Sequence, residues 1–249
     1  MVNILVPAMG KTLYFKDIMF PKMVLEIGEK TILERILENY NTITEKNFIF
    51  VFDKKDCLEF HLDESVKILT GVQSKTILLD NETGGALCTC LMAINAINND
   101  NPLVIANSDQ IIDVNYMDVI EQFIKENYDA GVITFNNIHP RWSYAKIVGN
   151  EIVEVAEKRP ISKNAIAGFY FFRRGRDFVD AAKSAIIKKN QHNGKYYISA
   201  SLNEVILKGK RVGAYNIKRE QYHSFYAPQQ ITEYESVIKR ERHESTETQ

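Results

Sequence analysis

Residues that suit phosphate chemistry occur first near the amino end of the chain. An apolar run passes into small residues and a lysine, in the order Val6, Pro7, Ala8, Met9, Gly10 and Lys11, and Lys22 follows shortly afterwards. A strand that ends in a loop of small residues exposes backbone N–H groups that can bind phosphate oxygens, and a nearby lysine adds positive charge. The loop has neither G-x-G-x-x-G nor G-x-x-x-x-G-K-[ST], which argues against a dinucleotide fingerprint and a P-loop. Taken alone, the segment is also explained by a tight structural turn.

A carboxylate follows another apolar run. Residues 102–107 (PLVIAN) predict a buried strand, and Asn107, Ser108 and Asp109 come at its end. Proteins usually hold Mg²⁺ through one or two carboxylates together with phosphates and water, so Asp109 could hold this ion. A turn or a helix N-cap is the alternative role for an aspartate at this position.

An acid and two bases, Glu157, Lys158 and Arg159, follow a predicted strand and precede Pro160. A carboxylate accepts hydrogen bonds from hydroxyl groups, and an ammonium group binds an anion. The Glu–Lys pair therefore suits a ligand that carries both hydroxyls and a phosphate. A solvated strand end is the alternative.

The elements that must position these residues alternate between strand and helix. Apolar runs predict strands at residues 3–8, 47–52, 75–79, 102–107 and 129–135, and helical spacing predicts helices at residues 30–41, after Asp53, at 86–97 and around 114–127. This alternation predicts an α/β fold with three layers and a mostly parallel, mixed, Rossmann-like sheet. Ligands of such sheets bind at the carboxyl ends of the strands, near a switch in strand order.

The second half changes character. A hairpin is predicted across Gly149 and Asn150, and further elements are predicted as strands at residues 165–172 and 211–217 and as helices at 177–189 and 199–210. The last residues are charged and polar, as in a fraying helix end.

The charge balance excludes some classes of partner. The chain has 31 basic and 32 acidic residues, for a net charge of −1, which predicts no strong attraction to nucleic acid or to an anionic membrane. No apolar run approaches the ~18 residues of a membrane span, and the amino end does not resemble a signal peptide. We therefore expect a cytoplasmic protein whose affinity for anions comes from local groups.

The three cysteines, Cys57, Cys88 and Cys90, form neither a disulfide framework nor a C-x-x-C pair. This pattern predicts a reducing compartment and no structural zinc. We expect Cys88 and Cys90 to be small core residues, with metal binding or redox chemistry as the alternative.

In their order and spacing, the motifs resemble those of the nucleotidyltransferase superfamily that makes nucleotide sugars. The resemblance covers about residues 2–235 and rests on Pro21-Lys22, Thr83-Gly84-Gly85-Ala86, Asn107-Ser108-Asp109, Glu157-Lys158-Arg159-Pro160, Ala165-Ile166-Ala167-Gly168-Phe169-Tyr170, Tyr197-Ile198-Ser199 and Leu202-Asn203. The chain looks most like the short members encoded in bacterial capsule and surface-polysaccharide gene clusters. The resemblance implies the GT-A-like α/β fold of that superfamily.

The same resemblance implies roles for individual residues. It implies a Mg²⁺-dependent enzyme that joins a nucleoside triphosphate to a sugar or polyol phosphate and releases pyrophosphate. Catalysis would depend on Lys22, at the α-phosphate, and on Asp109, as the metal ligand. The implied nucleotide-binding residues are Pro7, Ala8, Met9, Gly10, Lys11, Thr83, Gly84, Gly85 and Asn107. The implied acceptor-binding residues are Tyr144, Glu157, Lys158 and Gly168, with Ser143 as a further hydroxyl contact.

The resemblance also implies an organisation and a substrate class. We expect one domain over residues 1–240, with a nucleotide-binding half at about 1–135, an acceptor-binding half at about 136–235 and a polar tail at 241–249. Members without a long carboxyl-terminal extension are similar to cytidylyltransferases, so CTP is favoured. The acceptor stays open among hexose, ketose, polyol and amino-alcohol phosphates. No nucleic acid or membrane partner is expected, and a homodimer is compatible with the sequence.

Three positions depart from the family pattern. Thr12 replaces the second glycine of the loop, Tyr14 stands where the family has an arginine, and Ser224 falls at the second metal aspartate. Lys11 and His223 are the candidates to compensate. Two other functions therefore stay open. One is a family-2-type glycosyltransferase, although Asn107-Ser108-Asp109 is not a D-x-D motif, and the other is a catalytically inactive nucleotide-binding subunit.

Overall fold

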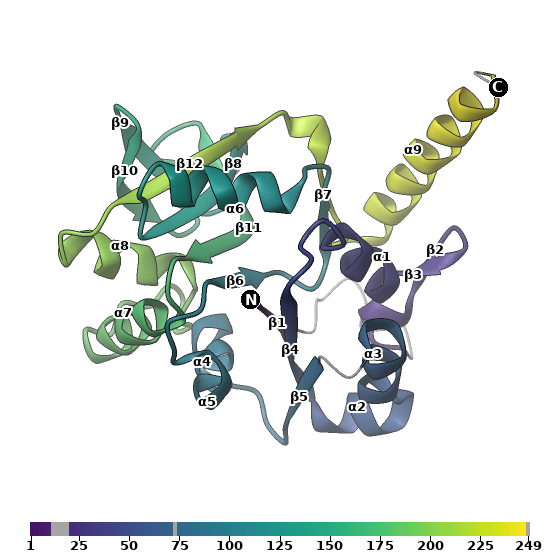
Figure 1. The fold of residues 1–249 in the computed structure, drawn as a ribbon, viewed down its shortest axis with the longest axis horizontal. Helices are drawn as coiled ribbons and strands as arrows, with labels where there is room; N and C mark the ends of the chain where they lie inside the picture. The colour runs from purple at the N-terminus through teal and green to yellow at the C-terminus, as the bar shows by residue number, and fades with distance from the viewer. Residues whose placement is uncertain (11–19, 72–73, 248–249) are drawn as a thin grey trace.

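The structure, a computed structural model, describes residues 1–10, 20–71 and 74–247, and side chains up to residue 240. Across these ranges a nine-stranded mixed sheet forms the centre of the molecule (Figure 1). Its strands are β1 (Val2–Ala8), β4 (Lys46–Asp53), β5 (Ser74–Leu79), β6 (Leu103–Ala106), β8 (Ala130–Asn136), β9 (Tyr144–Val148), β10 (Glu151–Ala156), β11 (Asn164–Phe172) and β12 (Val212–Ile217).

The strand order places a switch point beside β1. One path through the sheet runs β10-β9-β11-β6-β1-β4-β5, and β8 joins β11 to β12. The strands β6, β1, β4 and β5 are parallel, whereas β11 is antiparallel to both β6 and β8. After β1 the chain builds β4 and β5 on one side and then returns to form β6 on the other. Ligands of open α/β sheets bind at the carboxyl ends of the strands at such a reversal. The expected α/β fold with a mostly parallel mixed sheet is confirmed.

Helices cover both faces of the sheet. They are α1 (Ile32–Asn39), α2 (Lys54–Phe60), α3 (Leu62–Thr70), α4 (Ala86–Leu91), α5 (Ile94–Ile97), α6 (Tyr116–Lys125), α7 (Gly175–Ile187), α8 (Ser199–Leu207) and α9 (Pro228–Glu247), with 3-10 turns η2 (Lys22–Val24) and η3 (Arg219–Gln221). Ile4 and Val6 pack with α1, α3 and α6, and Leu5 packs on the other face with α4, α7 and α8. The alternation of strand side chains therefore builds two hydrophobic cores from one sheet.

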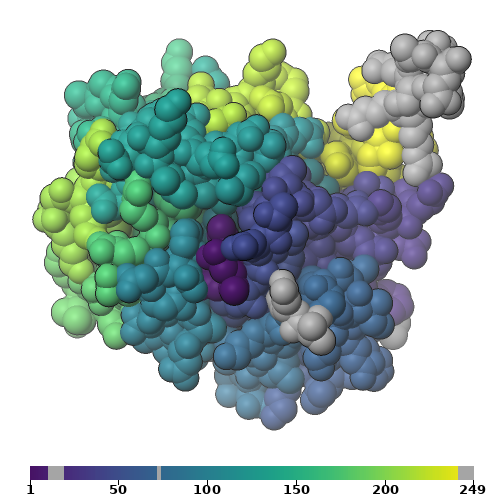
Figure 2. Space-filling view, in the orientation of Figure 1, coloured from purple at the N-terminus to yellow at the C-terminus, as the bar shows by residue number. Residues whose placement is uncertain are grey.

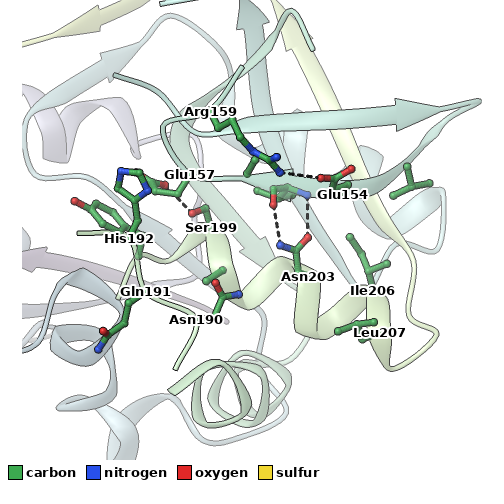
Figure 3. A pocket seen from close by; sticks show the side chains of 15 residues that line it. Glu154, Glu157, Arg159, Asn190, Gln191, His192, Ser199, Asn203, Ile206 and Leu207 are labelled. Carbon is green, nitrogen blue, oxygen red and sulfur yellow. Dashed lines mark hydrogen bonds and ion pairs between the residues drawn. The ribbon is translucent and has the colours of Figure 1, made fainter. Parts of the chain in front are cut away.

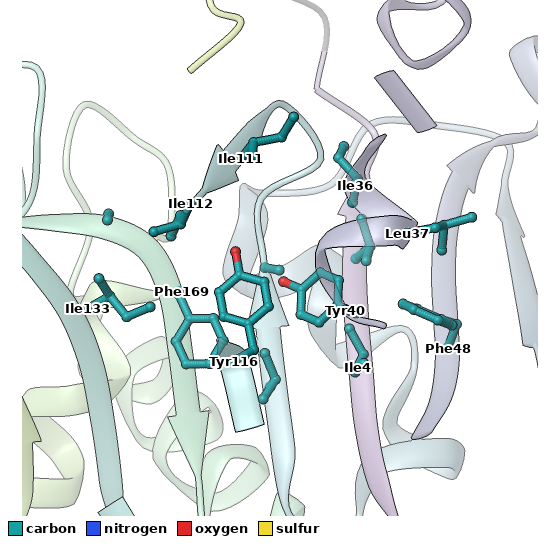
Figure 4. Packing of buried hydrophobic residues seen from close by; sticks show 14 of the residues in the cluster. Ile4, Ile36, Leu37, Tyr40, Phe48, Ile111, Ile112, Tyr116, Ile133 and Phe169 are labelled. Atoms are coloured by element: carbon teal, nitrogen blue, oxygen red, sulfur yellow. The ribbon is translucent and has the colours of Figure 1, made fainter. Parts of the chain in front are cut away.

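An aromatic stack joins distant parts of the first core (Figure 4). Tyr40, at the end of α1, stacks on Tyr116 of α6 at a centroid distance of 4.5 Å, and Tyr116 stacks on Phe169 of β11 at 5.0 Å. Large rings contribute much of a core's buried area, and stacked pairs add to it. The stack therefore anchors β11 at Phe169, the residue after Gly168.

Short elements lie outside the main sheet. The strand β7 (Gln110–Ile112) pairs with β13 (Tyr222–Ser224), and β2 (Glu26–Ile27) pairs with β3 (Lys30–Thr31). The helix α9 runs outward from the body, and its first turns, yellow in Figure 2, lie at the edge of the molecule. Ile231 and Tyr234 of α9 pack against the first core. None of these elements was expected from the sequence apart from a fraying terminal helix.

Two predicted helices differ from the observed ones. Asp53 caps α2 as expected, because its carboxylate accepts from the backbone N–H groups of Lys55 and Asp56. The helix then ends at Phe60, and His61, at a φ of 51°, separates it from α3. The helix predicted at residues 86–97 is likewise divided into α4 and α5.

The remaining expectations concern the tail, the thiols and membranes. The predicted polar tail at 241–249 overlaps α9, which continues to Glu247. Cys57 and Cys90 are buried free thiols and Cys88 is half-buried, and burial raises the pKa of all three. In the described ranges, no helix has both the length and the apolar character to cross a membrane. The division into a nucleotide half and an acceptor half stays a prediction.

Candidate active site

Two residues predicted to act in catalysis meet at the switch point. Asp109 follows β6, and Lys22 begins η2 after Pro21. Lys22 Nζ donates to Asp109 Oδ2 at 2.6 Å, and the two side chains are 11% and 24% exposed. Because β1 and β6 are parallel neighbours, the loops after Ala8 and Ala106 leave the sheet at the same edge. The pair therefore lies beside the predicted phosphate loop.

The β7–β13 ribbon holds the backbone of Asp109. Phe225 N donates to Asp109 O at 2.7 Å, and Ser224 pairs with Gln110 across the ribbon. Ser224, which the motif alignment put at the family's second metal aspartate, thus lies next to the Asp109 segment. Its hydroxyl accepts from Gln230 Nε2 at 2.8 Å and carries no charge. Burial raises the pKa of the neighbouring Tyr222 hydroxyl, and the negative charge of Asp109 raises it further.

His223, the candidate second metal ligand, is directed elsewhere. Its Nε2 lies 2.6 Å from Asp113 Oδ2, and its ring packs against Tyr234. In the described part of the chain, no group of three or more His, Cys, Asp or Glu side chains is arranged so that it could hold a metal ion. Mg²⁺ needs no such cluster, because it is commonly held by one or two carboxylates plus substrate phosphates and water. Asp109 stays the predicted ligand of an ion that a phosphate-bearing substrate would share.

Gly168 makes room for the loop that carries Asp109. It lies where the pairing of β11 with β8 is irregular, and its φ is +64°. A Cβ at this position would overlap the side chains of Asn107 and Gln110, and Gly168 O accepts from Asn107 N at 3.2 Å. The glycine was expected to approach the acceptor. The structure gives it a different neighbour, the Asn107–Gln110 turn.

A cavity of about 190 Å³ lies at the end of β1, where the phosphate loop is predicted to begin. Its lining consists of Pro7, Met9, Gly10, Glu82, Thr83, Gly85, Ala86, Thr89 and Lys195. Five of the predicted nucleotide-binding residues are therefore brought together in one pocket. Ala8 and Gly84 are sequence neighbours of lining residues, and Asn107 follows β6 at the switch point. None of these three residues lines the cavity. Lys11, Thr12 and Tyr14 lie outside the described residues.

The turn at Gly84 and Gly85 is fastened to a distant segment. Tyr196 N donates to Gly84 O at 2.8 Å, and Leu87 N donates to Tyr196 O at 3.1 Å. Gly85 has a φ of +127°, and a Cβ on it would overlap the backbone of Tyr196. We expected these glycines to permit close approach of a base. In the structure, Gly85 permits close approach of the Tyr196 backbone.

Glu157 and Lys158 are fixed by residues from other elements. Glu157 Oε2 accepts from the hydroxyls of Ser143 and Ser199, the latter at 2.8 Å. Lys158 Nζ donates to the Tyr197 hydroxyl at 2.9 Å. Lys158 also has a φ of 51°, a conformation that costs a non-glycine residue about 1 kcal/mol or more and often marks a functional position.

A second cavity of about 520 Å³ opens beside Glu157 (Figure 3). It lies between β10, α8 and the loop after α7, and its polar lining includes Glu154, Glu157, Arg159, Asn190, His192 and Tyr197. Volumes of this size are typical of small-molecule pockets. The acids, amides and guanidinium group suit a ligand with several hydroxyls.

Tyr144 was predicted to contact the acceptor, and this prediction is wrong for the described conformation. Its side chain is fully buried, and its hydroxyl donates to His139 O at 2.6 Å. A side chain without exposed surface cannot contact a ligand. Ser143, the neighbouring hydroxyl, instead positions Glu157.

Two asparagines hold strands beside the two parts of the site. Asn203 of α8 accepts from Val155 N and donates to Val155 O, both at 2.8 Å. Asn39 of α1 accepts from Ile112 N at 3.1 Å and donates to Ile112 O at 3.0 Å. A side-chain amide thus satisfies both backbone groups of one strand residue, as a neighbouring strand would. The first holds β10 before Glu157, and the second holds β7 after Asp109.

The sequence predictions missed Glu82, Lys195 and His192. Lys195 and His192 flank Asn193 and Gly194, a dipeptide that is a strong signal for a two-residue hairpin turn. The Asn-Gly signal could have predicted a tight turn at this position. It could not have predicted that the residues on either side of the turn line two different cavities.

Comparison with known proteins was made on sequence and on structure. A family model described as "Nucleotidyl transferase" matches residues 17–221, a range that begins after β1 and the phosphate loop. A bifunctional protein GlmU of Streptococcus gordonii is 26% identical over 217 residues, which cover 80% of this chain and 43% of the relative. A GlmU of Methanococcus aeolicus is 27% identical over 157 residues, which cover 61% of this chain and 35% of the relative. The chain spans less than half the length of these curated relatives.

Solved structures share the fold over nearly the whole chain. A nucleoside-diphosphate-sugar pyrophosphorylase from Vibrio cholerae RC9 superposes with a TM-score of 0.77 at 21% identity, covering 95% of this chain and 100% of that one. A Bacillus anthracis protein assigned as a glucose-1-phosphate thymidylyltransferase, in complex with sucrose, gives a TM-score of 0.79 at 16% identity and covers 95% of both chains.

Proposed function

Because the chain belongs to the nucleotidyl transferase family, we propose that it joins a nucleoside triphosphate to a phosphorylated sugar or alcohol. An oxygen of the acceptor's phosphate attacks the α-phosphorus and forms a new P–O bond. The bond between the α-phosphorus and the oxygen that bridges to the β-phosphate breaks, and pyrophosphate leaves with that electron pair. A phosphate monoester is already an anion at pH 7, since its second pKa is about 6. The reaction therefore needs no strong general base.

The observation that supports this proposal is the Lys22–Asp109 pair. It lies at the sheet edge where β1 and β6 end, and the 190 Å³ cavity is lined by Pro7, Met9 and Gly10 at the end of β1. Lys22 places a cation where charge develops on the α-phosphate, and preorganised charge of this kind is a large term in catalysis. Asp109 would hold Mg²⁺, and the bound ion would neutralise the phosphates and align them. The nucleotide would lie along Pro7, Met9 and Gly10.

The acceptor would bind at Glu157 and Lys158. The carboxylate of Glu157 suits acceptor hydroxyls, and the ammonium of Lys158 suits the acceptor phosphate. The 520 Å³ cavity beside Glu157 would take the rest of the molecule. Hexose, ketose, polyol and amino-alcohol phosphates are all compatible with its mixed polar lining.

We propose CTP as the first nucleotide to test, from the resemblance to compact cytidylyltransferases. TTP is the second, because the Bacillus anthracis neighbour is assigned as a thymidylyltransferase. A product of this kind would serve as a precursor for a capsule or another surface polysaccharide in the cytoplasm. We propose one domain over residues 1–240 that acts with Mg²⁺.

A substrate panel tests the function. Purified protein with Mg²⁺ is given CTP, TTP, UTP, ATP or GTP together with one phosphorylated acceptor, and pyrophosphate is measured. Release for one pairing, dependent on both substrates, is the expected result. Tight binding of a nucleoside triphosphate without pyrophosphate release from any pairing would contradict the proposal and favour a regulatory subunit, in line with the uncharged Ser224. Turnover of a nucleotide sugar in its place would favour a glycosyltransferase.

A further inference from the structure

The loop between α7 and α8 contains a rigid two-residue turn. Asn193 and Gly194 have φ values of 49° and 74°, and His192 and Lys195 exchange backbone hydrogen bonds at 3.0 and 3.1 Å. Positive φ at both central residues is the geometry of a type I′ hairpin turn, for which Asn-Gly is strongly preferred. The turn therefore fixes the backbones of His192 and Lys195 relative to each other.

The next residue attaches this turn to the nucleotide side of the site. Tyr196 exchanges backbone hydrogen bonds with the Gly84–Leu87 turn, and Gly85 has no Cβ to prevent the contact. The Gly84–Leu87 turn provides Gly85 and Ala86 to the 190 Å³ cavity. Lys195 is consequently held at that cavity by hydrogen bonds on both sides of its own position.

Lys195 is an exposed cation on the wall of this cavity. Within the described ranges no side chain pairs with its ammonium group, whereas Lys22 is bonded to Asp109. With a net charge of −1 the chain offers no general attraction for a polyanion, so a nucleotide depends on local cations. An ammonium group at the wall of the pocket supplies such a charge.

His192 lies at the other cavity. It lines the 520 Å³ pocket, and Figure 3 shows its ring on the same side as Glu157. The ring meets Tyr197 edge-on at a centroid distance of 6.2 Å, and Tyr197 accepts from Lys158. His192 is thus next to the two residues assigned to the acceptor.

We propose that this one turn serves both substrates, with Lys195 binding the nucleoside triphosphate and His192 binding the acceptor. The inference rests on the proposed function, since it assumes that the smaller cavity takes the nucleotide and the larger one the acceptor. Lys195 contributes through its charge, and His192 contributes through a ring nitrogen that hydrogen-bonds the acceptor.

Binding measurements on the full chain test this assignment. Calorimetry is done with Mg²⁺ and each of the five nucleoside triphosphates, and separately with glucose 1-phosphate, fructose 6-phosphate, glycerol 3-phosphate and choline phosphate. Lys195→Gln should weaken the tightest nucleotide by a factor of about 10 or more, the scale of one charged hydrogen bond, and leave acceptor binding unchanged. His192→Ala should weaken binding of the tightest acceptor and leave nucleotide binding unchanged. Lys195→Arg should restore nucleotide binding, and Lys189→Gln, a nearby exposed lysine outside the cavity lining, should have no effect.

The outcomes separate this inference from the function it rests on. If the unmodified protein binds nucleotide and Lys195→Gln binds it equally well, the assignment of Lys195 is wrong while the proposed function stands. If both variants weaken both ligands together, the turn has only a structural role and the inference is wrong. If the unmodified protein binds no nucleoside triphosphate at all, the proposed function itself fails.

Discussion

Lys22 Nζ and Asp109 Oδ2 lie 2.6 Å apart, although 87 positions separate the two residues in the sequence. Both side chains are largely buried, and their opposite charges stabilise each other there. The pair holds a cation and a carboxylate at the edge of the sheet where the phosphate loop begins. A bound nucleotide with its metal ion would divide the pair, taking the cation at the α-phosphate and the carboxylate at the metal.

The first prediction concerns the two partners. Lys22→Ala and Asp109→Ala should each lower kcat by at least ~100-fold, the scale of losing one preorganised charge-stabilising group. Initial rates of pyrophosphate release measure this. The control is Lys30→Ala, which removes an ion pair with Glu38 that is about half exposed and therefore contributes little. Near-normal rates in either site variant would mean that the active site lies elsewhere.

The second prediction concerns the metal. A chelator should stop pyrophosphate release, and added Mg²⁺ should restore it. Asp109→Asn should bind Mn²⁺, used as a paramagnetic probe with nucleotide present, about 10-fold or more weakly, because one charged ligand is lost. Asp113→Asn is the matched control, since Asp113 pairs with His223 rather than with Lys22. Equal Mn²⁺ binding by Asp109→Asn and the unmodified protein would exclude Asp109 as the metal ligand.

The third prediction concerns Gly168. Gly168→Ala should destabilise the protein by about 1–3 kcal/mol, because its Cβ would overlap Asn107 and Gln110. Gly149→Ala is a close control. Gly149 has a φ of +60° but nothing within 4 Å of an added Cβ, so it reports the cost of the backbone conformation alone. Denaturant unfolding compares the two. A Gly168→Ala variant no less stable than Gly149→Ala would contradict this prediction, because it would show that the Asn107–Gln110 turn can move away from the added Cβ at no cost in stability.

The fourth prediction uses the two asparagines that hold β7 and β10. Asn39→Ala and Asn203→Ala each remove two hydrogen bonds to a strand, so each should lose about 1–3 kcal/mol of stability. Their kinetic effects should differ. Asn203→Ala should raise KM for the acceptor, because β10 leads to Glu157, and Asn39→Ala should lower kcat, because β7 follows Asp109. Identical kinetic changes in the two variants would mean that the strands do not position separate parts of the site.

The regular part of the fold was predictable because its signals are local. The strands β1, β4, β5, β6, β8 and β11 coincide closely with apolar runs, and α1, α6, α7 and α8 follow helical spacing. Asp53 correctly predicted the start of α2, and Gly149 and Asn150 correctly predicted the turn between β9 and β10. Such features need only neighbouring residues to be recognised.

The parts that were missed depend on long-range contacts. The strands β7 and β13 have three residues each, too few to show a period, and they pair across more than a hundred positions. The family resemblance implied that Tyr144 contacts the acceptor, but tertiary packing buries its side chain. Gly85 and Gly168 were identified as important glycines, yet their neighbours, Tyr196 and Asn107, could not be known without coordinates.

The transfer of a labelled α-phosphate tests the central claim most directly. The protein is incubated with Mg²⁺, the active acceptor and a nucleoside triphosphate labelled with ³²P at either the α or the γ position. The account predicts that the α label appears in a nucleoside-diphosphate-linked acceptor and the γ label in pyrophosphate. Transfer of the γ label to the acceptor, or recovery of the α label only in unreacted nucleotide, would contradict nucleotidyl transfer.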